Sequence, residues 1–306
     1  MSKVVVVKSQ DRELRQPLTR AEYNLFLTAG LRALTGEPNA VAALRKLLPP
    51  GVVGMKTNCL AGKANSTPVA LTEALADMLI KTDRDANDIV VWERTSRELA
   101  EAGYELNAAS TAIRCLGTDA NGVGYSDQFY SYGEVNSLVS RIITRVVDFN
   151  INLPVLKDHS IAGLSAGLKN MYGAIHNPNK YHGDNCNPFC AHVANLTPIR
   201  LKNRLTIIDA VRVQYNGGPA YVGSYLHYYG GLVIATDPVA ADRVGLEILE
   251  YIRATNNHPP LAQVERPVQY LKTAAEIGLG IAELDDIDLE VLDIDVTGNA
   301  KEGTLF

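Results

Sequence analysis

The chain has 306 residues, of which 46% are hydrophobic and 21% are charged, and its formal net charge is −5. This composition is ordinary for a globular protein with a sizeable core, and without a concentrated basic block it disfavours nucleic acid or an anionic membrane surface as a partner. No apolar run approaches the ~18 residues that a membrane-spanning helix needs, and the N-terminus lacks a signal-peptide pattern, so we expect a cytoplasmic protein.

Strand-like and helix-like segments alternate through the first third of the sequence. Apolar and β-branched runs predict buried strands at residues 3–8, 52–58 and 89–93. Apolar residues at helical spacing predict helices at residues 20–34, 40–48 and 68–81. Thr19-Arg-Ala-Glu22 matches a capping box, and Ser66-Thr67-Pro68 offers a cap followed by an N1 proline. This alternation predicts the α/β class, with a mainly parallel sheet flanked by helices.

The rest of the chain continues the pattern less regularly. Strands are predicted at residues 112–116, 148–157, 205–208, 232–235 and 287–296, and helices at residues 138–147, 163–172, 238–253 and 265–277. Residues 174–200 are polar, with several Asn and Pro, and we predict that they form a long loop over a functional site. Because the sequence shows neither an internal repeat nor a low-complexity linker, we expect one α/β domain over residues 1–306.

The first candidate cluster begins with Lys157-Asp-His159, which closes a predicted strand, and ends with Lys169. Ligands of open α/β sheets bind outside such strand ends. The intervening Gly, Ala and Ser residues permit close approach of the backbone to a ligand. Lys169 would hold a carboxylate or phosphate, or act as a Schiff-base amine if desolvated. The alternative is that both lysines lie on the surface and that the small residues only allow tight helix packing.

The second cluster places two thiols and two imidazoles within eleven residues: His182, Cys186, Cys190 and His192. Cys and His are preferred ligands of zinc and other borderline metals, so we predict these four as a pool of ligands for Ni, Zn or Fe, or for a metal-containing cofactor. The two cysteines are four residues apart, which is not a standard zinc spacing. The alternative is a polar loop with two buried thiols and unrelated histidines.

Further polar or turn residues lie near the ends of predicted elements. We predict a role in binding substrate or cofactor for Lys56, Asn58, Asn170, Tyr172, Asp209, Asn216 and Gly217. Because Lys56, Lys157, His159 and Asp209 each close a predicted strand, we expect them to converge at one edge of the sheet. The sequence contains no Walker A motif, no dinucleotide fingerprint after the first strand, no G-x-S-x-G elbow and no HExxH.

Several of these segments together resemble the bacterial and archaeal family named domain of unknown function 362. The resemblance runs from about residue 50 to the C-terminus and depends on Lys56-Thr-Asn58, Ser66-Thr67-Pro68, Asn152-Leu-Pro-Val-Leu-Lys157-Asp-His159, Leu168-Lys169-Asn170-Met-Tyr-Gly173, Ile208-Asp209-Ala210, Gly217-Gly218-Pro219 and Asp237-Pro-Val-Ala-Ala-Asp242. Many relatives carry an additional ferredoxin-like segment with clustered cysteines, which this sequence lacks. The resemblance therefore implies no iron–sulfur role here.

A shorter segment, His159-x-x-Ala-Gly-x-Ser-x-Gly-x-Lys169, resembles the part of nickel-pincer lactate racemases that holds a catalytic histidine and the cofactor-linked lysine. By this resemblance, His176 or His182 would be the metal-binding histidine. It also implies chemistry at a carbon next to a carboxylate.

The resulting hypothesis is an enzyme that transfers a proton or hydride at a carbon of a small anionic organic substrate with the help of a metal or cofactor. His159 would be the general acid/base, because an ordinary imidazole pKa of about 6.5 suits that role, with Lys169 and Lys157 as the other catalytic groups. This corresponds to an isomerase or oxidoreductase, and the chain is compatible with a homo-oligomer. The alternatives are a metallocentre or redox accessory protein that binds metal without turnover, and a metal-independent enzyme that binds a phosphate or carboxylate ligand.

Overall fold

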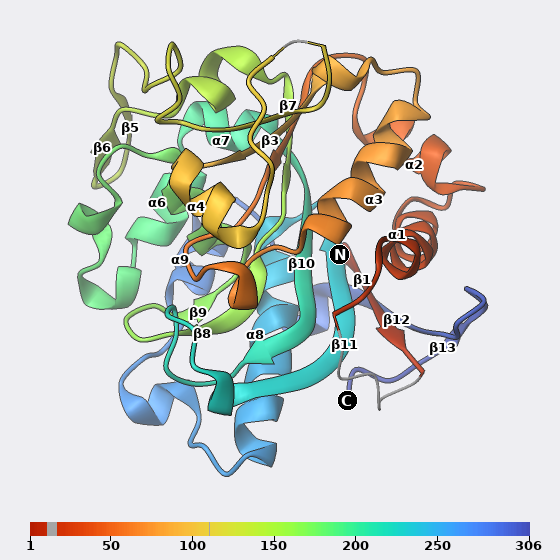
Figure 1. The fold of residues 1–306 in the computed structure, drawn as a ribbon. Helices are drawn as coiled ribbons and strands as arrows, with labels where there is room; N and C mark the ends of the chain where they lie inside the picture. Colours follow the sequence, from red (N-terminus) through yellow and green to blue (C-terminus); the bar gives the residue numbers. More distant parts are fainter. Residues whose placement is uncertain (11–16, 110) are drawn as a thin grey trace.

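The computed structural model of the chain describes residues 1–10, 17–109 and 111–306, and one mixed sheet runs through it (Figure 1). In these residues the sheet has eleven strands. Nine of them follow in the spatial order β13 (Ala300–Glu302), β12 (Ile287–Ile294), β1 (Ser2–Ser9), β11 (Leu226–Ala235), β10 (Asn203–Gln214), β7 (Phe149–Asn152), β2 (Val53–Lys56), β3 (Ile89–Glu93) and β4 (Arg114–Gly117). β8 (Val155–His159) pairs with β10, and β9 (Gly163–Ser165) pairs with β8.

The sheet is mostly parallel, as predicted. β10, β7, β2, β3 and β4 are parallel neighbours in that order, β8 is parallel to β10, and β1 is parallel to β12. Antiparallel pairing joins β11 to β1 and β10, and joins β9 to β8 and β13 to β12. The carboxyl ends of β2, β3, β7 and β8 consequently lie toward the same edge of the sheet.

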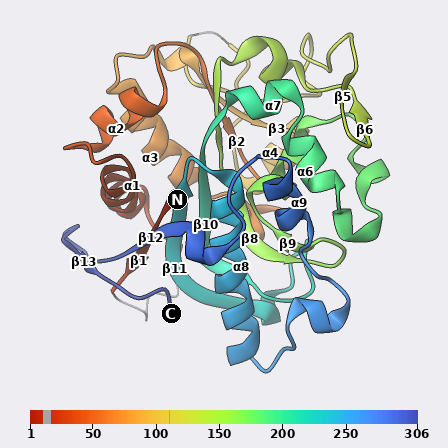
Figure 2. The ribbon, with the colours of Figure 1, turned by 180° about the vertical axis from the view of Figure 1, so that it is seen from behind.

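Helices cover both faces of the sheet (Figures 1 and 2). Successive side chains of β1 point to opposite faces of the sheet and so belong to two different cores. On one face, Val5 and Val7 pack with α1 (Arg20–Thr35), α2 (Ala40–Leu47) and α3 (Val69–Ile80). Val4 and Val6 pack on the other face with α8 (Pro238–Thr255). The fold is therefore α/β, with helices on both faces of the sheet.

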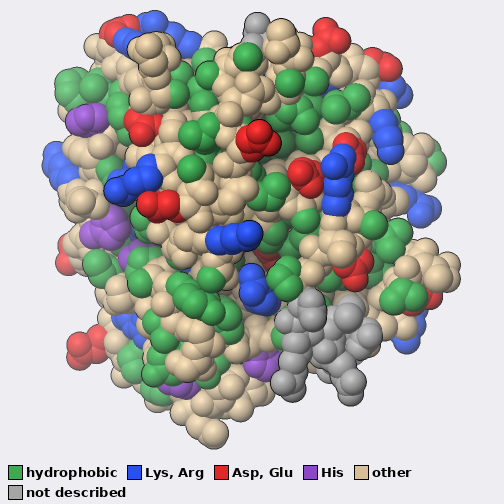
Figure 3. Space-filling view, viewed as in Figure 1, with side chains coloured by type: hydrophobic (Ala, Val, Ile, Leu, Met, Phe, Trp, Pro, Cys, Tyr) green, Lys and Arg blue, Asp and Glu red, His purple; other side chains and the backbone are tan. Residues whose placement is uncertain are grey.

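A third apolar cluster lies beside the sheet and supports the candidate site. It includes residues of α6 (Phe189–Ala194), α7 (Thr197–Lys202) and α9 (Tyr270–Glu276), and α5 (Gly167–Asn170) packs on α6 and α8. The remaining elements are α4 (Ser96–Ala102), the hairpin of β5 (Tyr130–Tyr132) and β6 (Val135–Ser137), the π-helical turn Ile142–Val146 and short 3₁₀ turns. Basic and acidic side chains are interspersed among the described residues on the face in Figure 3. No helix in the described part of the chain is long and apolar enough to span a bilayer.

Several helix starts have the predicted chemistry. The Thr19 capping box is present, Asn39 caps α2, and Asp237 caps α8 ahead of its proline. The helix α3 is present, but its predicted cap was wrong: Pro68 occupies the N-cap position itself instead of following a Ser or Thr cap. The Thr67 hydroxyl instead donates to the carbonyl of Leu153 at 2.6 Å, so it joins α3 to the turn after β7.

Two predicted segments near the site fold differently. Residues 148–157 form two strands rather than one, because Pro154 has no N–H for the ladder and β8 resumes farther along β10. Residues 163–172 do not form one helix. Gly163, at a φ of 76°, turns the chain back so that β9 pairs with β8, and only then does α5 begin. Residues 174–200 contain short helical turns and α6 in place of the predicted long loop, and three of them, Pro178, Asn179 and His182, line the cavity described below.

Candidate active site

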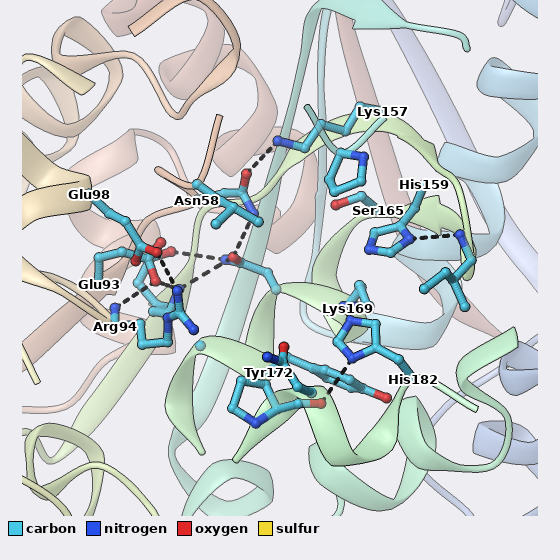
Figure 4. Close-up of a pocket in the computed structure, with 18 of the residues that line it drawn as sticks. Asn58, Glu93, Arg94, Glu98, Lys157, His159, Ser165, Lys169, Tyr172 and His182 are labelled. Atoms are coloured by element: carbon cyan, nitrogen blue, oxygen red, sulfur yellow. Dashed lines mark hydrogen bonds and ion pairs between the residues drawn. The ribbon is translucent and has the colours of Figure 1, made fainter. Parts of the chain in front are cut away.

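A cavity of about 570 Å³ lies at the carboxyl ends of β2, β3 and β8, the edge where open α/β sheets bind ligands. Figure 4 shows the labelled side chains surrounding one central space. The lining contains eight of the residues predicted from sequence: Lys56, Asn58, Lys157, His159, Lys169, Asn170, Tyr172 and His182. It also contains Leu60, Glu93, Arg94, Glu98, Ser160, Ile161, Ser165, Gly173, Pro178, Asn179 and Pro219.

Two of the cations at the cavity are neutralised by carboxylates. Lys56 Nζ lies 2.6 Å from Glu93 Oε1, and the other oxygen of Glu93 accepts the N–H of Cys59 at 3.0 Å. Arg94 lies 2.6 Å from Glu98. Because each cation has an acidic partner, these two pairs add little net charge to the cavity.

A chain of three side-chain amides, two buried and one half-buried, fixes the surroundings of Lys157. It starts at the backbone carbonyl of Gly167, which can only accept, so Asn152 must direct its Nδ2 there at 2.8 Å. Asn152 Oδ1 then accepts from Asn170 Nδ2 at 2.7 Å. Asn170 Oδ1 accepts from Asn58 Nδ2 at 3.1 Å, which leaves Asn58 Oδ1 to accept from Lys157 Nζ at 2.8 Å. We call these three asparagines the amide relay.

Lys157 has only neutral acceptors in the described structure. Its Nζ donates to Asn58 Oδ1 and, at 3.2 Å, to the carbonyl of Asn65, and the side chain is 1% exposed. Burial lowers the pKa of Lys157 to about 8. A neutral amine has two N–H groups and one lone pair, so two acceptors satisfy both hydrogens and leave the lone pair on the side of the cavity.

Two contacts stabilise the charged form of Lys169, and burial opposes it. Its Nζ lies 4.0 Å from the centroid of the Tyr172 ring, a cation–π contact, and 3.2 Å from His182 Nε2. His182 Nδ1 lies 3.0 Å from the carbonyl of Pro178, which fixes the proton of a neutral ring on Nδ1 and makes Nε2 an acceptor for Lys169. Burial lowers the pKa of Lys169, and no carboxylate pairs with it among the described residues.

His159 does not have the properties expected of a general acid/base. Its Nδ1 accepts the backbone N–H groups of Ile161 at 3.1 Å and Ala162 at 3.2 Å, so a neutral ring carries its proton on Nε2. Burial, and then the charges of Lys169 and His182, lower the pKa of His159 to about 2. Because Nε2 already holds a proton and two donors occupy Nδ1, the ring acts as a neutral hydrogen-bond donor.

Two buried aspartates hold the site elements in place. Asp242 of α8 accepts the N–H groups of Gly167 at 2.6 Å and Leu168 at 2.9 Å, which fixes the start of α5 and hence Lys169. Asp158, beside Lys157 in β8, accepts from Arg266 at 2.7 Å and from the N–H of Gly218 at 3.1 Å.

Three predicted ligand-binding residues lie outside the cavity. Asp209 is internal to β10, which continues to Gln214, and its carboxylate accepts from Tyr23 at 3.1 Å and from the N–H of Val211 at 2.8 Å. The expected convergence was therefore wrong for Asp209. Asn216 and Gly217 form the turn after β10, and the nearby residue that does line the cavity is Pro219.

The four predicted metal ligands do not converge. His182 faces Lys169, whereas Nδ1 of His192 accepts the N–H of Glu134. Cys186 and Cys190 are fully buried in the third apolar cluster, where their side chains lie next to each other and to Tyr172, but His192 lies apart from them. In the part of the chain that the structure describes, no three or more His, Cys, Asp or Glu side chains are grouped to hold a metal ion.

Sequence reasoning missed Glu93 and Asn152 among the residues that organise the site. Glu93 closes a predicted strand just as Lys56 does, so the same rule could have found it. Asn152 had no such signal, because only the break at Pro154 shows that a strand ends there. Arg94 reaches the cavity from the segment before α4, and Glu98 reaches it from α4 itself, a helix not predicted from sequence.

The fold and cavity define an α/β protein with a lysine-containing site at the carboxyl edge of its sheet. The chain belongs to the family described as Domain of unknown function (DUF362), whose sequence model matches residues 53–247, and this range contains every lining residue of the cavity. No curated protein matches the chain.

A crystal structure of a structural genomics target from Thermotoga maritima is similar, at 11% identity and a TM-score of 0.40. The similarity covers 79% of this chain and 60% of that one, so the chain spans less than two thirds of that protein's length. The resemblance of residues 159–169 to lactate racemases has no counterpart among these matches.

Proposed function

We propose that the protein is an enzyme that binds a small organic anion in this cavity and transfers a proton at a carbon next to the carboxylate or carbonyl carbon of that anion. The observation that supports this is a pair of lysines, Lys157 and Lys169, which are 1% and 9% exposed and line the same cavity. Neither has a carboxylate partner among the described residues. A buried ammonium group without a carboxylate partner is costly, and an anionic ligand bound by Lys169 would offset that cost.

The two lysines have different roles in this proposal. Lys169, held as a cation by the Tyr172 ring and His182, binds the anionic group. Lys157, as a neutral amine, takes the proton. His159 donates its Nε2–H to an oxygen of the substrate. Among the sequence-based hypotheses this is the metal-independent enzyme, and the separation of the four predicted metal ligands favours it over the metal-assisted one.

Deuterium exchange tests this proposal. The protein is incubated in D₂O with small 2-oxo and 2-hydroxy acids, and NMR follows the C–H signals next to the carboxylate or carbonyl carbon. Thermal melts with each acid report binding. Lys169→Ala should weaken binding about 10- to 100-fold, the effect of losing a hydrogen bond to a charged group. Lys157→Met should abolish exchange while binding persists, and His159→Asn should slow exchange with little change in binding.

Lys180→Ala is the matched control, because Lys180 is an exposed lysine of the same covering segment that does not line the cavity. The proposal is wrong if no acid of the panel binds or exchanges, or if the Lys157 and Lys169 variants behave like the control.

A further inference from the structure

We propose that Lys157 is a nucleophile that forms a Schiff base with the carbonyl carbon of a 2-oxo acid whose carboxylate is held by Lys169. This inference deepens the proposed function and rests on it, because it names the substrate class and the bond that the site makes. Its geometric basis is the number of acceptors at Lys157 and their fixed orientation.

The amide relay fixes which atom of Asn58 faces Lys157: it is the oxygen, which can only accept. Because the relay begins at the carbonyl of Gly167, each amide has one orientation, and an acceptor oxygen must face Lys157. The carbonyl of Asn65 is the second acceptor. A third N–H of an ammonium group would have no acceptor among the described residues, whereas the lone pair of an amine would face the cavity.

Lys169 fits the role of the carboxylate-binding cation and not that of the nucleophile. Its Nζ lies over the Tyr172 ring at 4.0 Å, and a ring face attracts an ammonium group more strongly than a neutral amine. Burial lowers the pKa of both lysines, so the contacts distinguish them: the Tyr172 ring stabilises an ammonium group at Lys169, whereas Lys157 has acceptors for only two N–H groups.

The condensation balances without an oxidant or reductant. The Lys157 lone pair attacks the carbonyl carbon, a C–N bond forms, and the C=O π electrons move to the oxygen, which takes a proton. The nitrogen loses one proton and gives a neutral carbinolamine. The hydroxyl then takes one proton from solvent and leaves as water with the C–O electron pair, and the nitrogen lone pair forms C=N, so the net reaction consumes one solvent proton. The resulting iminium keeps one N–H for Asn58 Oδ1, and its positive charge makes the adjacent C–H more acidic. His159 Nε2–H is the donor available to the carbonyl oxygen during attack.

Borohydride trapping tests the inference on the unmodified protein. Pyruvate, 2-oxobutyrate and 2-oxoglutarate are each added with sodium cyanoborohydride, and intact mass and peptide mapping follow. We expect one reduced adduct per chain, located at Lys157. Acetone, which lacks a carboxylate, should label at least tenfold more slowly, and lactate, which lacks a carbonyl group, should not label. Lys169→Ala should lower labelling by pyruvate at least tenfold, and Lys180→Ala should leave it unchanged.

The outcomes separate this inference from the proposed function. An adduct at Lys157 supports it, even if no proton exchange is found, and the proposed function alone then fails. Absence of an adduct with all three 2-oxo acids, or an adduct located at another lysine, overturns it. If no adduct forms at Lys157 but the protein still catalyses deuterium exchange, and Lys157→Met abolishes that exchange, then Lys157 acts as a base. The proposed function then stands, and only the covalent step is wrong.

Discussion

The lowered pKa of Lys157 makes a quantitative prediction about stability. On folding, this pKa falls from 10.5 to about 8. Between these values the unfolded chain binds the proton and the folded chain does not, so raising the pH through this interval stabilises the fold. At 1.36 kcal/mol for each unit of pKa, the folded protein should gain about 2–3 kcal/mol from this lysine between pH 7 and pH 10.

Lys157→Met removes this gain. Urea unfolding at pH 7 and at pH 10 gives, at each pH, the difference in the free energy of unfolding between parent and variant. The two differences should themselves differ by about 2–3 kcal/mol. The variant also leaves two acceptors unpaired, which costs about 1–3 kcal/mol each, but that cost is the same at both pH values and cancels. Lys81→Met, at an exposed lysine, is the control and should show no such change. Equal differences at the two pH values would mean that Lys157 keeps an ordinary pKa, and the neutral-amine argument would then be wrong.

Three further predictions concern the residues that hold the site together. Asp242→Asn can accept only one of the two backbone N–H groups at the start of α5, and should destabilise the fold by about 1–3 kcal/mol in urea unfolding; a change below 0.5 kcal/mol would contradict the capping role. Gly218→Ala would place a Cβ 1.8 Å from the carbonyl oxygen of Asp158, and we expect a loss of about 3 kcal/mol or more by the same measurement, with a normal melting temperature as the refuting result. Arg266→Met removes the closest cation from the buried Asp158 carboxylate, whose pKa burial already raises. We expect the free energy of unfolding to fall by about 3–5 kcal/mol at pH 7, and by less at lower pH, where the carboxyl group is protonated. A loss of stability that does not depend on pH would contradict this role of Arg266.

The sheet could be predicted well wherever strands are continuous apolar runs. Residues 3–8 and 89–93 are strands in the structure because their β-branched and apolar side chains are buried on both faces. The helix predicted at residues 163–172 was wrong, because small residues suit a helix and a hairpin equally well. The positive φ of Gly163 selects the hairpin over the helix, and this backbone angle is set by the pairing of β9 with β8, which the local sequence does not show.

The site could be predicted in part, by the rule that polar residues at the ends of parallel strands face a ligand. That rule found Lys56, Lys157 and His159. It failed for Asp209, because β10 extends five residues beyond it as a partner for β8 and β11. Residue type alone also suggested a proton-transfer role for His159, which its two backbone N–H donors exclude.

The amide relay also has a consequence for how this sequence can diverge. Its direction is set once, at a backbone carbonyl that no mutation can remove, and each asparagine passes that direction to the next. Replacing any one of them by aspartate, its closest relative in shape, would put an oxygen where its neighbour's oxygen needs a donor. A substitution at Asn152, Asn170 or Asn58 therefore disturbs the hydrogen bonds of the other two, although Asn58 and Asn170 lie 112 positions apart in the chain.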